Sequence, residues 1–585
     1  MIKTLLKSVK QYKKPSLLCP LYMVGEAAME ILIPWLTTFI IQELTNLSQI
    51  ENYQVDVNKI IICSSSMVVC ALFALFCGIM GARYASVASC GFARNLREDM
   101  YLNMQSFSFA NIDRYSTASL ITRITTDVTN VQNAYQMCIR MLVRAPVMFI
   151  AAIIMTSVLE PRMTAIFVLA SIILGVIIFI CLFKVVPHFK MMFKKYDKLN
   201  SVVQEDLTAI RVVKSYVRED REIFKMQNAT AEVYKYSVKA EKILTFMTPC
   251  VNLVMSATIV VILLIGSNMV TGNIGGAVKP ENIQALIFYA MQILNGVIMV
   301  AMCLNFISLS KGSMDRICEV LSEKTTLPEP QNPVKEISDG TVEFENVSFS
   351  YSDKAEKSVL KNINLKIFSG DTVGIIGATG SGKTSLVSLI PRLYDASEGE
   401  VKVGGRNVKE YDLETLRNKV AMVLQRNVLF TGTVAENLRW GDEHATEGEM
   451  RFAARQACAE EFIDALPNGY GYDLGQGGVN VSGGQKQRLC IARAMLKKPH
   501  VIIFDDSTSA VDTKTDSSIR EALKKYAPQT TKIIIAQRIA SVMEADRIIV
   551  LDEGGVSGIG SHEELLETNS IYRDVYLSQM KGDEE

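Results

Sequence analysis

The stretch Gly377-Ala378-Thr379-Gly380-Ser381-Gly382-Lys383-Thr384 decides how the second half of this chain folds. It follows Asp371–Ile376, which we expect to form a β-strand, and it precedes Ser385–Leu393, which we expect to form a helix. A glycine-rich loop in this position turns backbone N–H groups toward phosphate oxygens, and the helix N-terminus adds its positive dipole. The strand–loop–helix context therefore predicts a P-loop that binds a nucleotide.

Residue types in and near this loop suit the parts of a nucleotide and its metal ion. Lys383 reaches the β/γ-phosphates, and the hydroxyl of Thr384 suits Mg²⁺. A second expected strand, Val501–Phe504, ends in Asp505, where a carboxylate beside a P-loop holds Mg²⁺, and Asp506 lies where a general base is expected. The residues predicted to cradle the nucleotide are Gly377, Thr379, Gly380, Ser381, Gly382, Lys383, Thr384 and Ser385.

A second anion-binding pattern lies between these two strands. The run Ser482-Gly483-Gly484-Gln485 opens an expected helix with a serine and two glycines, which again leaves backbone N–H groups at a helix N-terminus. One domain rarely needs two such sites. The second site therefore suggests that this run binds the nucleotide of a neighbouring subunit.

The first part of the chain has a different composition. Hydrophobic residues make up 49% of the whole sequence and gather before residue 311, where six mostly uncharged stretches predict membrane-spanning helices. Lys+Arg and Asp+Glu balance at 61 each, which excludes a strongly basic nucleic-acid binder, and the twelve cysteines form no CxxC pair. The expected spans are Pro15–Gln42, Ile60–Ala82, Ala145–Leu159, Met163–Phe183, Ile243–Val278 and Asn282–Ser310.

The distribution of Lys and Arg predicts the orientation of these spans. The N-terminus and the segments Arg83–Met137 and Lys184–Lys242 are rich in both residues, so both termini and both long segments are expected to be cytoplasmic. The long segments have helical periodicity and few breakers, which predicts hairpins that extend past the bilayer, with connectors at Asn111–Leu120 and Ser215–Phe224. The expected domains are 1–325 in the membrane, a proline-containing linker at 326–340, and a nucleotide domain at 341–585.

Two acidic residues stand in the first span. Glu26 and Glu30 are one helical turn apart and share a face, and an acid in mid-bilayer costs about 2.5–3.5 kcal/mol on insertion scales. They would line a substrate pathway, form a structural hydrogen bond between helices, or lie nearer the interface; the sequence leaves these alternatives open.

Together the P-loop, the SGGQ run and the loop Ser509-Ala510-Val511-Asp512 resemble an ATP-binding cassette (ABC) domain. Six spans before such a domain resemble a half-size ABC exporter: an α transmembrane domain of six long helices fused to an α/β P-loop domain. The resemblance implies that Tyr351 stacks on adenine, Gln425 touches Mg²⁺, and Ser482, Gly483, Gly484 and Gln485 close on the ATP of a partner. It also implies coupling helices at the two hairpin tips, a location in a bacterial plasma membrane and a small amphipathic substrate.

Three positions depart from the family pattern. Asp506 stands where Glu is usual, Gln537 where a switch-loop His is usual, and Gln476 where a Glu precedes the signature. Asp is one methylene shorter than Glu, and Gln cannot gain a proton, so the first two changes weaken the ATP site on this chain's own P-loop. Because the SGGQ run is intact, the pattern predicts one degenerate and one competent site in a heterodimer. A homodimer with slow sites, an importer and an ATP-gated regulatory subunit are the alternatives.

Overall fold

The computed structural model describes residues 2–49, 55–270, 279–351, 358–506 and 513–582. The chain forms two compact units. Unit 1 consists of Met1–Gln105 and Thr117–Glu323, and unit 2 consists of Ser106–Ser116 and Lys324–Glu585. Each unit is described by itself below.

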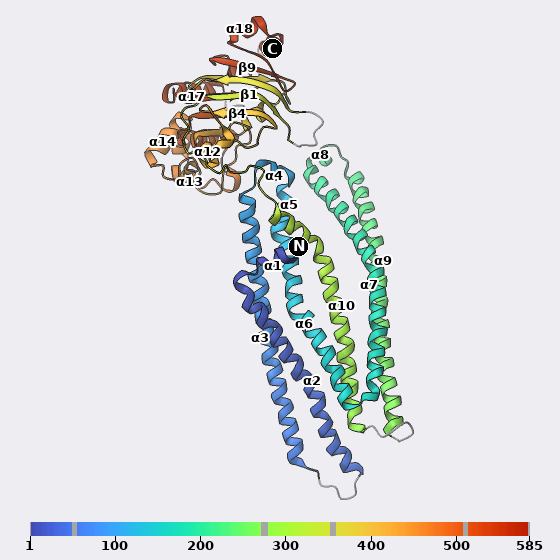
Figure 1. Cartoon of the computed structure of the whole chain (residues 1–585). Helices are drawn as coiled ribbons and strands as arrows, with labels where there is room; N and C mark the ends of the chain where they lie inside the picture. The colour runs from blue at the N-terminus through green and yellow to red at the C-terminus, as the bar shows by residue number, and fades with distance from the viewer. Residues whose placement is uncertain (1, 50–54, 271–278, 352–357, 507–512, 583–585) are drawn as a thin grey trace. The chain divides into compact units, whose positions relative to one another are not determined.

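Unit 1 is entirely helical in the part of the chain that the structure describes, and Figure 1 shows its long helices running side by side. Its elements are α1 (Ile2–Lys7), η1 (Lys10–Tyr12), α2 (Lys13–Gln49), α3 (Val57–Gln105), α5 (Thr117–Thr122), η2 (Arg123–Asp127), α6 (Val128–Leu159), α7 (Pro161–Thr208), α8 (Ile210–Ser215), α9 (Glu219–Val270) and α10 (Pro280–Ser322). Within the described residues, six helices are long and apolar enough to cross a membrane: α2, α3, α6, α7, α9 and α10. The prediction of six spans is confirmed. Residues 271–278, at the end of the expected span Ile243–Val278, lie outside the described residues.

The helices of unit 1 are much longer than a bilayer requires. At 1.5 Å per residue, the 49 residues of α3 and the 52 of α9 extend about 74 and 78 Å, against a hydrocarbon core of about 30 Å. They pack as the pairs α2–α3, α7–α9 and α6–α10. Tyr289 of α10 is fully buried, and its hydroxyl donates to the carbonyl of Ile31 in α2 at 2.8 Å, which links two of these pairs.

The connectors of the two hairpins differ in how well the sequence located them. The first hairpin holds α4 (Phe109–Arg114) and α5, which overlap the predicted Asn111–Leu120. The second prediction, Ser215–Phe224, is wrong by about one helical turn, because the short helix is α8, at Ile210–Ser215, and α9 already begins at Glu219. The acidic residues Glu219, Asp220 and Glu222 in the first turn of α9 favour a helix start there.

Unit 2 contains two sheets. An antiparallel sheet has the order β2-β1-β4-β5, and a larger, mostly parallel sheet has the order β10-β9-β3-β8-β7-β6. The strands are β1 (Val342–Phe349), β2 (Leu360–Ile367), β3 (Thr372–Gly377), β4 (Glu398–Val403), β5 (Arg406–Asn407), β6 (Val420–Val423), β7 (Val501–Asp505), β8 (Thr531–Ile535), β9 (Arg547–Asp552) and β10 (Gly555–Gly560). This confirms the predicted α/β class for the second half of the chain.

Helices cover the sheets of unit 2. They are α4, α11 (Lys383–Ser388), η3 (Val408–Glu410), α12 (Leu413–Lys419), α13 (Val434–Arg439), α14 (Glu447–Gln456), α15 (Glu460–Ala465), η4 (Gly469–Gly471), η5 (Gln476–Gly478), α16 (Gly483–Leu496), α17 (Thr513–Tyr526), η6 (Ile539–Ser541), α18 (His562–Thr568) and α19 (Ser570–Gly582). Residues of β7 alternate between two hydrophobic cores: Ile502 and Phe504 belong to one, and Val501 and Ile503 to the other. A strand buried on both faces explains its uninterrupted apolar run.

The topology gathers the predicted site at one edge of the larger sheet. Strands β9, β3, β8, β7 and β6 run parallel, so their carboxyl ends meet at the same edge. The residues that follow β3, β7, β8 and β6 are the P-loop, Asp506, Gln537 and Gln425 in turn. Ligands of open parallel sheets bind at this edge.

Candidate nucleotide site

The P-loop joins the end of β3 to α11 and needs glycine at several positions. A Cβ on Gly377 would lie 2.2 Å from the carbonyl oxygen of Leu551, so a side chain there would clash with the neighbouring strand. Gly382 has a φ of +96°, in the left-handed region that glycine adopts without strain. These constraints shape the loop into a cradle of backbone N–H groups.

The polar side chains of this cradle are positioned for an anion. The Lys383 ammonium donates to the carbonyls of Gly377 at 2.7 Å and Ala378 at 2.9 Å, and burial lowers its pKa although Asp505 and Asp506 oppose that shift. The Ser381 hydroxyl is buried and has no hydrogen-bond partner among the described residues. A buried hydroxyl without a partner inside a phosphate-type loop fits a bound phosphate oxygen.

The expected Mg²⁺ ligands meet in the fold. The Thr384 hydroxyl donates to Asp505 Oδ1 at 2.9 Å, although the two residues are 121 positions apart. Asp505 is only 3% exposed, and its burial, with the nearby charge of Asp506, raises the pKa of this carboxyl. A hydroxyl and a carboxylate in contact supply the oxygen ligands that Mg²⁺ prefers, so these residues fit the ion.

Asp506 is held by two amides. Gln537 donates through Nε2 to Asp506 Oδ2 at 2.8 Å, and Gln425 Nε2 lies 3.4 Å from the same oxygen. Asp506 also adopts a φ of +46°, which is unusual for a residue with a side chain and is found preferentially at functional sites. The structure therefore brings together the predicted general-base, switch and Q-loop residues, and two neutral amides lie against one carboxylate oxygen of Asp506.

Tyr351 lies beside the P-loop helix, half-exposed, with its hydroxyl 2.8 Å from Ser385 Oγ. Its ring makes an edge contact with Tyr394, with centroids 5.2 Å apart. The Tyr394 hydroxyl in turn donates to Asp113 Oδ2 of α4 at 2.5 Å, and its ring lies 6.0 Å from that of Phe109. The sequence reasoning missed Tyr394 and Asp113, because no spacing or motif relates residues 281 positions apart.

The signature run begins a separate helix. Ser482 caps α16: its hydroxyl accepts from the backbone N–H of Gln485 at 3.3 Å, and the Gln485 side chain accepts from the Ser482 N–H at 2.8 Å. Ser482 and Gly483 are exposed, and a Cβ on Gly483 would meet no heavy atom within 4 Å. The run thus presents an open helix N-terminus, together with Gly484, at the surface of unit 2. The loop Ser509-Ala510-Val511-Asp512 lies outside the described residues.

In unit 1, the two acids of α2 have a partner that the sequence did not reveal. Arg144 of α6 donates to both oxygens of Glu30, at 2.7 and 2.8 Å, and lies 3.4 Å from Glu26 Oε1. Glu26 is 9% exposed, and its second carboxyl oxygen is buried without a hydrogen-bond partner in the described part of the chain. Of the alternatives that the sequence left open, this contact favours the one in which Glu30 forms a structural hydrogen bond between helices.

Comparisons with known proteins agree with these observations. Family models described as "ABC transporter transmembrane region" and "ABC transporter" match residues 17–297 and 360–509. The chain is 34% identical to an uncharacterized ABC transporter ATP-binding protein of Bacillus subtilis, YfiB, over 98% of both proteins. It is 31% identical to an ATP-dependent lipid A-core flippase of Desulfotalea psychrophila, over 82% of each. The fold matches a bacterial Atm1-family ABC exporter with ATP bound at a TM-score of 0.81, 22% identity and coverage of 97% of this chain and 98% of that one.

Proposed function

This chain belongs to the ABC transporter family as a half-size, ATP-hydrolysing exporter, and from that premise we propose that it is the degenerate-site subunit of a heterodimer. In this proposal its own P-loop binds Mg-ATP that turns over slowly. Its Ser482–Gln485 run completes the hydrolytic site on the partner's P-loop. Binding and hydrolysis together switch the membrane domain between inward and outward access.

The contact between Asp506 and Gln537 is the observation that carries the proposal. A general base needs a carboxylate oxygen directed at water and a neighbour that can exchange a proton. Here Gln537 donates to Asp506 at 2.8 Å, and an amide has no titratable proton at physiological pH. Both members of the pair therefore favour retention of ATP over its hydrolysis, while the exposed Ser482 N-cap keeps its family form.

The residues around the P-loop still suit nucleotide binding. Mg²⁺ would be held by Thr384, Asp505 and Gln425, where it supplies charge neutralisation for phosphate oxygens. Lys383 exchanges its contacts with the loop carbonyls for phosphate oxygens, and the buried Ser381 hydroxyl gains a partner. Tyr351, half-exposed beside Ser385, offers its ring to the adenine.

A homodimer would combine the degenerate pair with the intact signature at both of its sites. Both sites would then be slow, which conflicts with the ATP-hydrolysing character of the family. A heterodimer avoids this conflict, because the partner supplies the glutamate and histidine for the second site. This difference makes the heterodimer the better-supported assembly.

We propose further that the substrate is a small amphipathic molecule moved across a bacterial plasma membrane. A cavity of about 360 Å³ lies between α6, α7 and α10, and is lined by apolar residues that include Pro146, Phe149, Gly175 and Gly296. Gly175 is 14 residues from the start of α7, or about 21 Å along the helix, which places the cavity within the hydrocarbon core. An apolar lining of this kind accepts the hydrocarbon part of a ligand. One relative bears the name of a lipid A-core flippase.

The test compares the chain alone with its native complex. The tagged chain, purified from its own host in lipid nanodiscs, is expected to bring down a second half-transporter in equal amount and to hydrolyse ATP. The same chain expressed alone is expected to hydrolyse ATP at least about tenfold more slowly. A Ser482→Arg complex controls for contaminating ATPase. Comparable turnover by the chain alone would contradict the heterodimer.

A further inference from the structure

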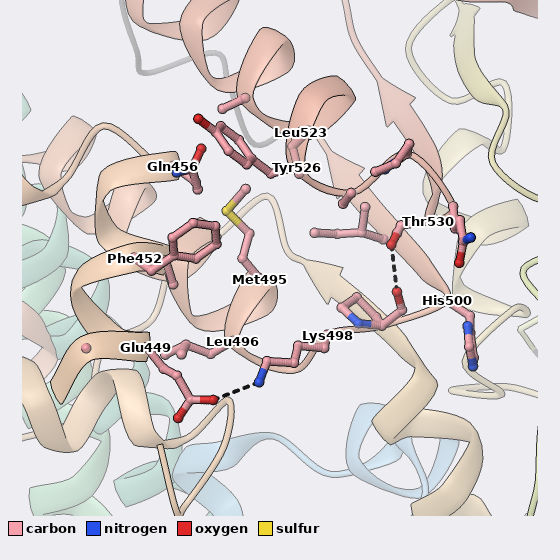
Figure 2. Close-up of a pocket in the computed structure, with 18 residues that line it drawn as sticks. Glu449, Phe452, Gln456, Met495, Leu496, Lys498, His500, Leu523, Tyr526 and Thr530 are labelled. Atoms are coloured by element: carbon pink, nitrogen blue, oxygen red, sulfur yellow. Dashed lines mark hydrogen bonds and ion pairs between the residues drawn. The ribbon is translucent and has the colours of Figure 1, made fainter. Parts of the chain in front are cut away.

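A second cavity, of about 510 Å³, lies in unit 2 away from the nucleotide site. Its walls are formed by α14, the end of α16, the end of α17 and the residues that precede β7 and β8 (Figure 2). The floor is apolar and includes Ala453, Met495, Leu496 and Leu523. A cavity of this size accepts a ligand of drug-like dimensions.

Two aromatic rings stand at the mouth of this cavity. Phe452 of α14 and Tyr526 of α17 are about half-exposed, at 51% and 50%, and pack edge to face with centroids 5.7 Å apart. These two solvent-exposed rings border an apolar cavity. A flat aromatic ligand would bury part of their exposed surface, which favours its binding.

The charges around the cavity are balanced. Lys498 Nζ pairs with Glu449 Oε1 at 2.7 Å at the rim (Figure 2), and this contact with Lys498 lowers the pKa of Glu449 to about 2. Burial, aided by Lys419, lowers the pKa of His500, so its ring is neutral at pH 7. With no unbalanced charge on these groups, the lining favours a neutral ligand over an anion or a cation.

Gln456 brings an amide to the wall of this cavity. The residue is only 7% exposed, and its amide makes no hydrogen bond with a described residue, although the amide atoms themselves are not sealed from solvent. By contrast, the hydroxyl of Thr530 on the opposite wall already donates to the carbonyl of Pro499 at 2.9 Å. A carboxamide offers a donor and an acceptor side by side, so it pairs with a ligand that presents an acceptor beside a donor.

The walls of the cavity are the far ends of the elements that carry the nucleotide contacts. Helix α16 begins beside Ser482 and ends in the wall at Leu496, about 21 Å away for its 14 residues. The wall residue His500 precedes β7, which ends at Asp505, and Thr530 precedes β8, which leads to Gln537. A ligand in this cavity therefore contacts the ends of three elements that carry predicted nucleotide residues: α16, β7 and β8.

We propose that this cavity binds neutral, aromatic small molecules that present adjacent hydrogen-bond donor and acceptor groups, and that their binding regulates ATP turnover. The aromatic body lies against the Phe452–Tyr526 pair over the apolar floor, and the polar edge pairs with the Gln456 amide. The bound molecule restrains α16 and so slows the closure of Ser482 on nucleotide. This regulation is separate from the heterodimer proposal, because it requires only the fold of unit 2.

The test uses two matched probes, quinolin-2-one and N-methylquinolin-2-one. The first places N–H beside C=O, and the second has the same rings without the donor. Binding is measured by saturation-transfer NMR on the full chain with its partner in lipid nanodiscs, with empty nanodiscs as the reference. Quinolin-2-one is expected to bind at least about fivefold more tightly than its methyl analogue, and to lower kcat at least about twofold with the KM for ATP unchanged.

Two variants separate the cavity from the membrane. Gln456→Met keeps the volume of the side chain and is expected to abolish the preference for quinolin-2-one. Ala522→Phe, on the α17 wall, is expected to weaken both probes and remove their effect on ATPase. Equal binding of the two probes to the parent, survival of the effect in Ala522→Phe, or binding without any change in kcat would each overturn the proposal. If Ala522→Phe fails to assemble, the Gln456→Met comparison decides.

Discussion

At the scale of single residues, Asp506 differs from an efficient general base in length and in its neighbours. One of its carboxylate oxygens faces two amides, Gln537 at 2.8 Å and Gln425 at 3.4 Å. The Gln537 amide orients the Asp506 carboxylate but cannot exchange a proton with it. The pair therefore lacks the proton transfer that a Glu–His pair provides. Replacing only one member of the Asp506–Gln537 pair with the usual residue should therefore restore little ATP hydrolysis at this site.

The variant Asp506→Glu tests this reasoning in the two-chain complex. It adds the missing methylene but leaves Gln537 in place, so steady-state ATPase should stay within about twofold of the parent. Ser482→Arg in the same background should remove the activity, which identifies where hydrolysis occurs. A several-fold rise in turnover from Asp506→Glu alone would show that length was the only defect of this site.

At the scale of elements, α4 contacts the nucleotide region through side chains within unit 2. The Tyr394 hydroxyl donates to Asp113 of α4, and the Tyr394 ring contacts that of Tyr351. Burial, followed by the Asp113 hydrogen bond and charge, raises the pKa of Tyr394, so the phenol keeps its proton and remains a donor. The contact thus joins α4 to the ring that the proposed function assigns to the adenine.

Removal of this hydrogen bond gives a measurable coupling. Tyr394→Phe keeps the ring contacts and Asp113→Ala removes the acceptor, and each should lower thermal stability of the complex by a similar amount. The double variant should cost no more than either single variant, with a coupling of about 1–3 kcal/mol. Additive losses would indicate that the two side chains act independently.

The bridge between α2 and α6 makes a prediction for unit 1. Arg144 is 15 residues before the end of α6, about 22 Å along the helix, and a bilayer core of about 30 Å that begins at that end would include it. Arg144→Met leaves Glu26 and Glu30 without this partner and should lower the unfolding temperature in nanodiscs by at least about 5 °C. Adding Glu26→Gln and Glu30→Gln should recover most of the loss. An unchanged unfolding temperature for Arg144→Met would place the three residues in water.

Elements differ in how far the sequence predicted them. The P-loop, the six spans and the Thr384–Asp505 pair follow from local pattern and from parallel strands, whose carboxyl ends share an edge. The Arg144 and Tyr394 contacts join residues 114 and 281 positions apart on elements whose packing no local pattern specifies. The second hairpin tip was misplaced because neither Ile210–Ser215 nor the residues on either side of it contain a glycine or proline that would mark the end of α7.

At the scale of the whole molecule, the proposed function requires two chains, because it builds each ATP site from the P-loop of one subunit and the signature run of the other. In the proposed assembly this chain brings a P-loop that binds Mg-ATP, an Asp506–Gln537 pair that turns ATP over slowly, and the Ser482 cap for the partner's site. In a heterodimer, damage to the cap and damage to Asp506 should therefore have unequal effects.

The most direct measurement is the steady-state ATPase of the two-chain complex carrying either Ser482→Arg or Asp506→Asn, after both chains are shown to assemble. Ser482→Arg places a bulky cation at the exposed start of α16 and should lower turnover at least about a hundredfold. Asp506→Asn alters only the slow site and should leave more than about half of the activity. Equal damage from the two variants would contradict the degenerate-site account and make Asp506 a working catalytic acid.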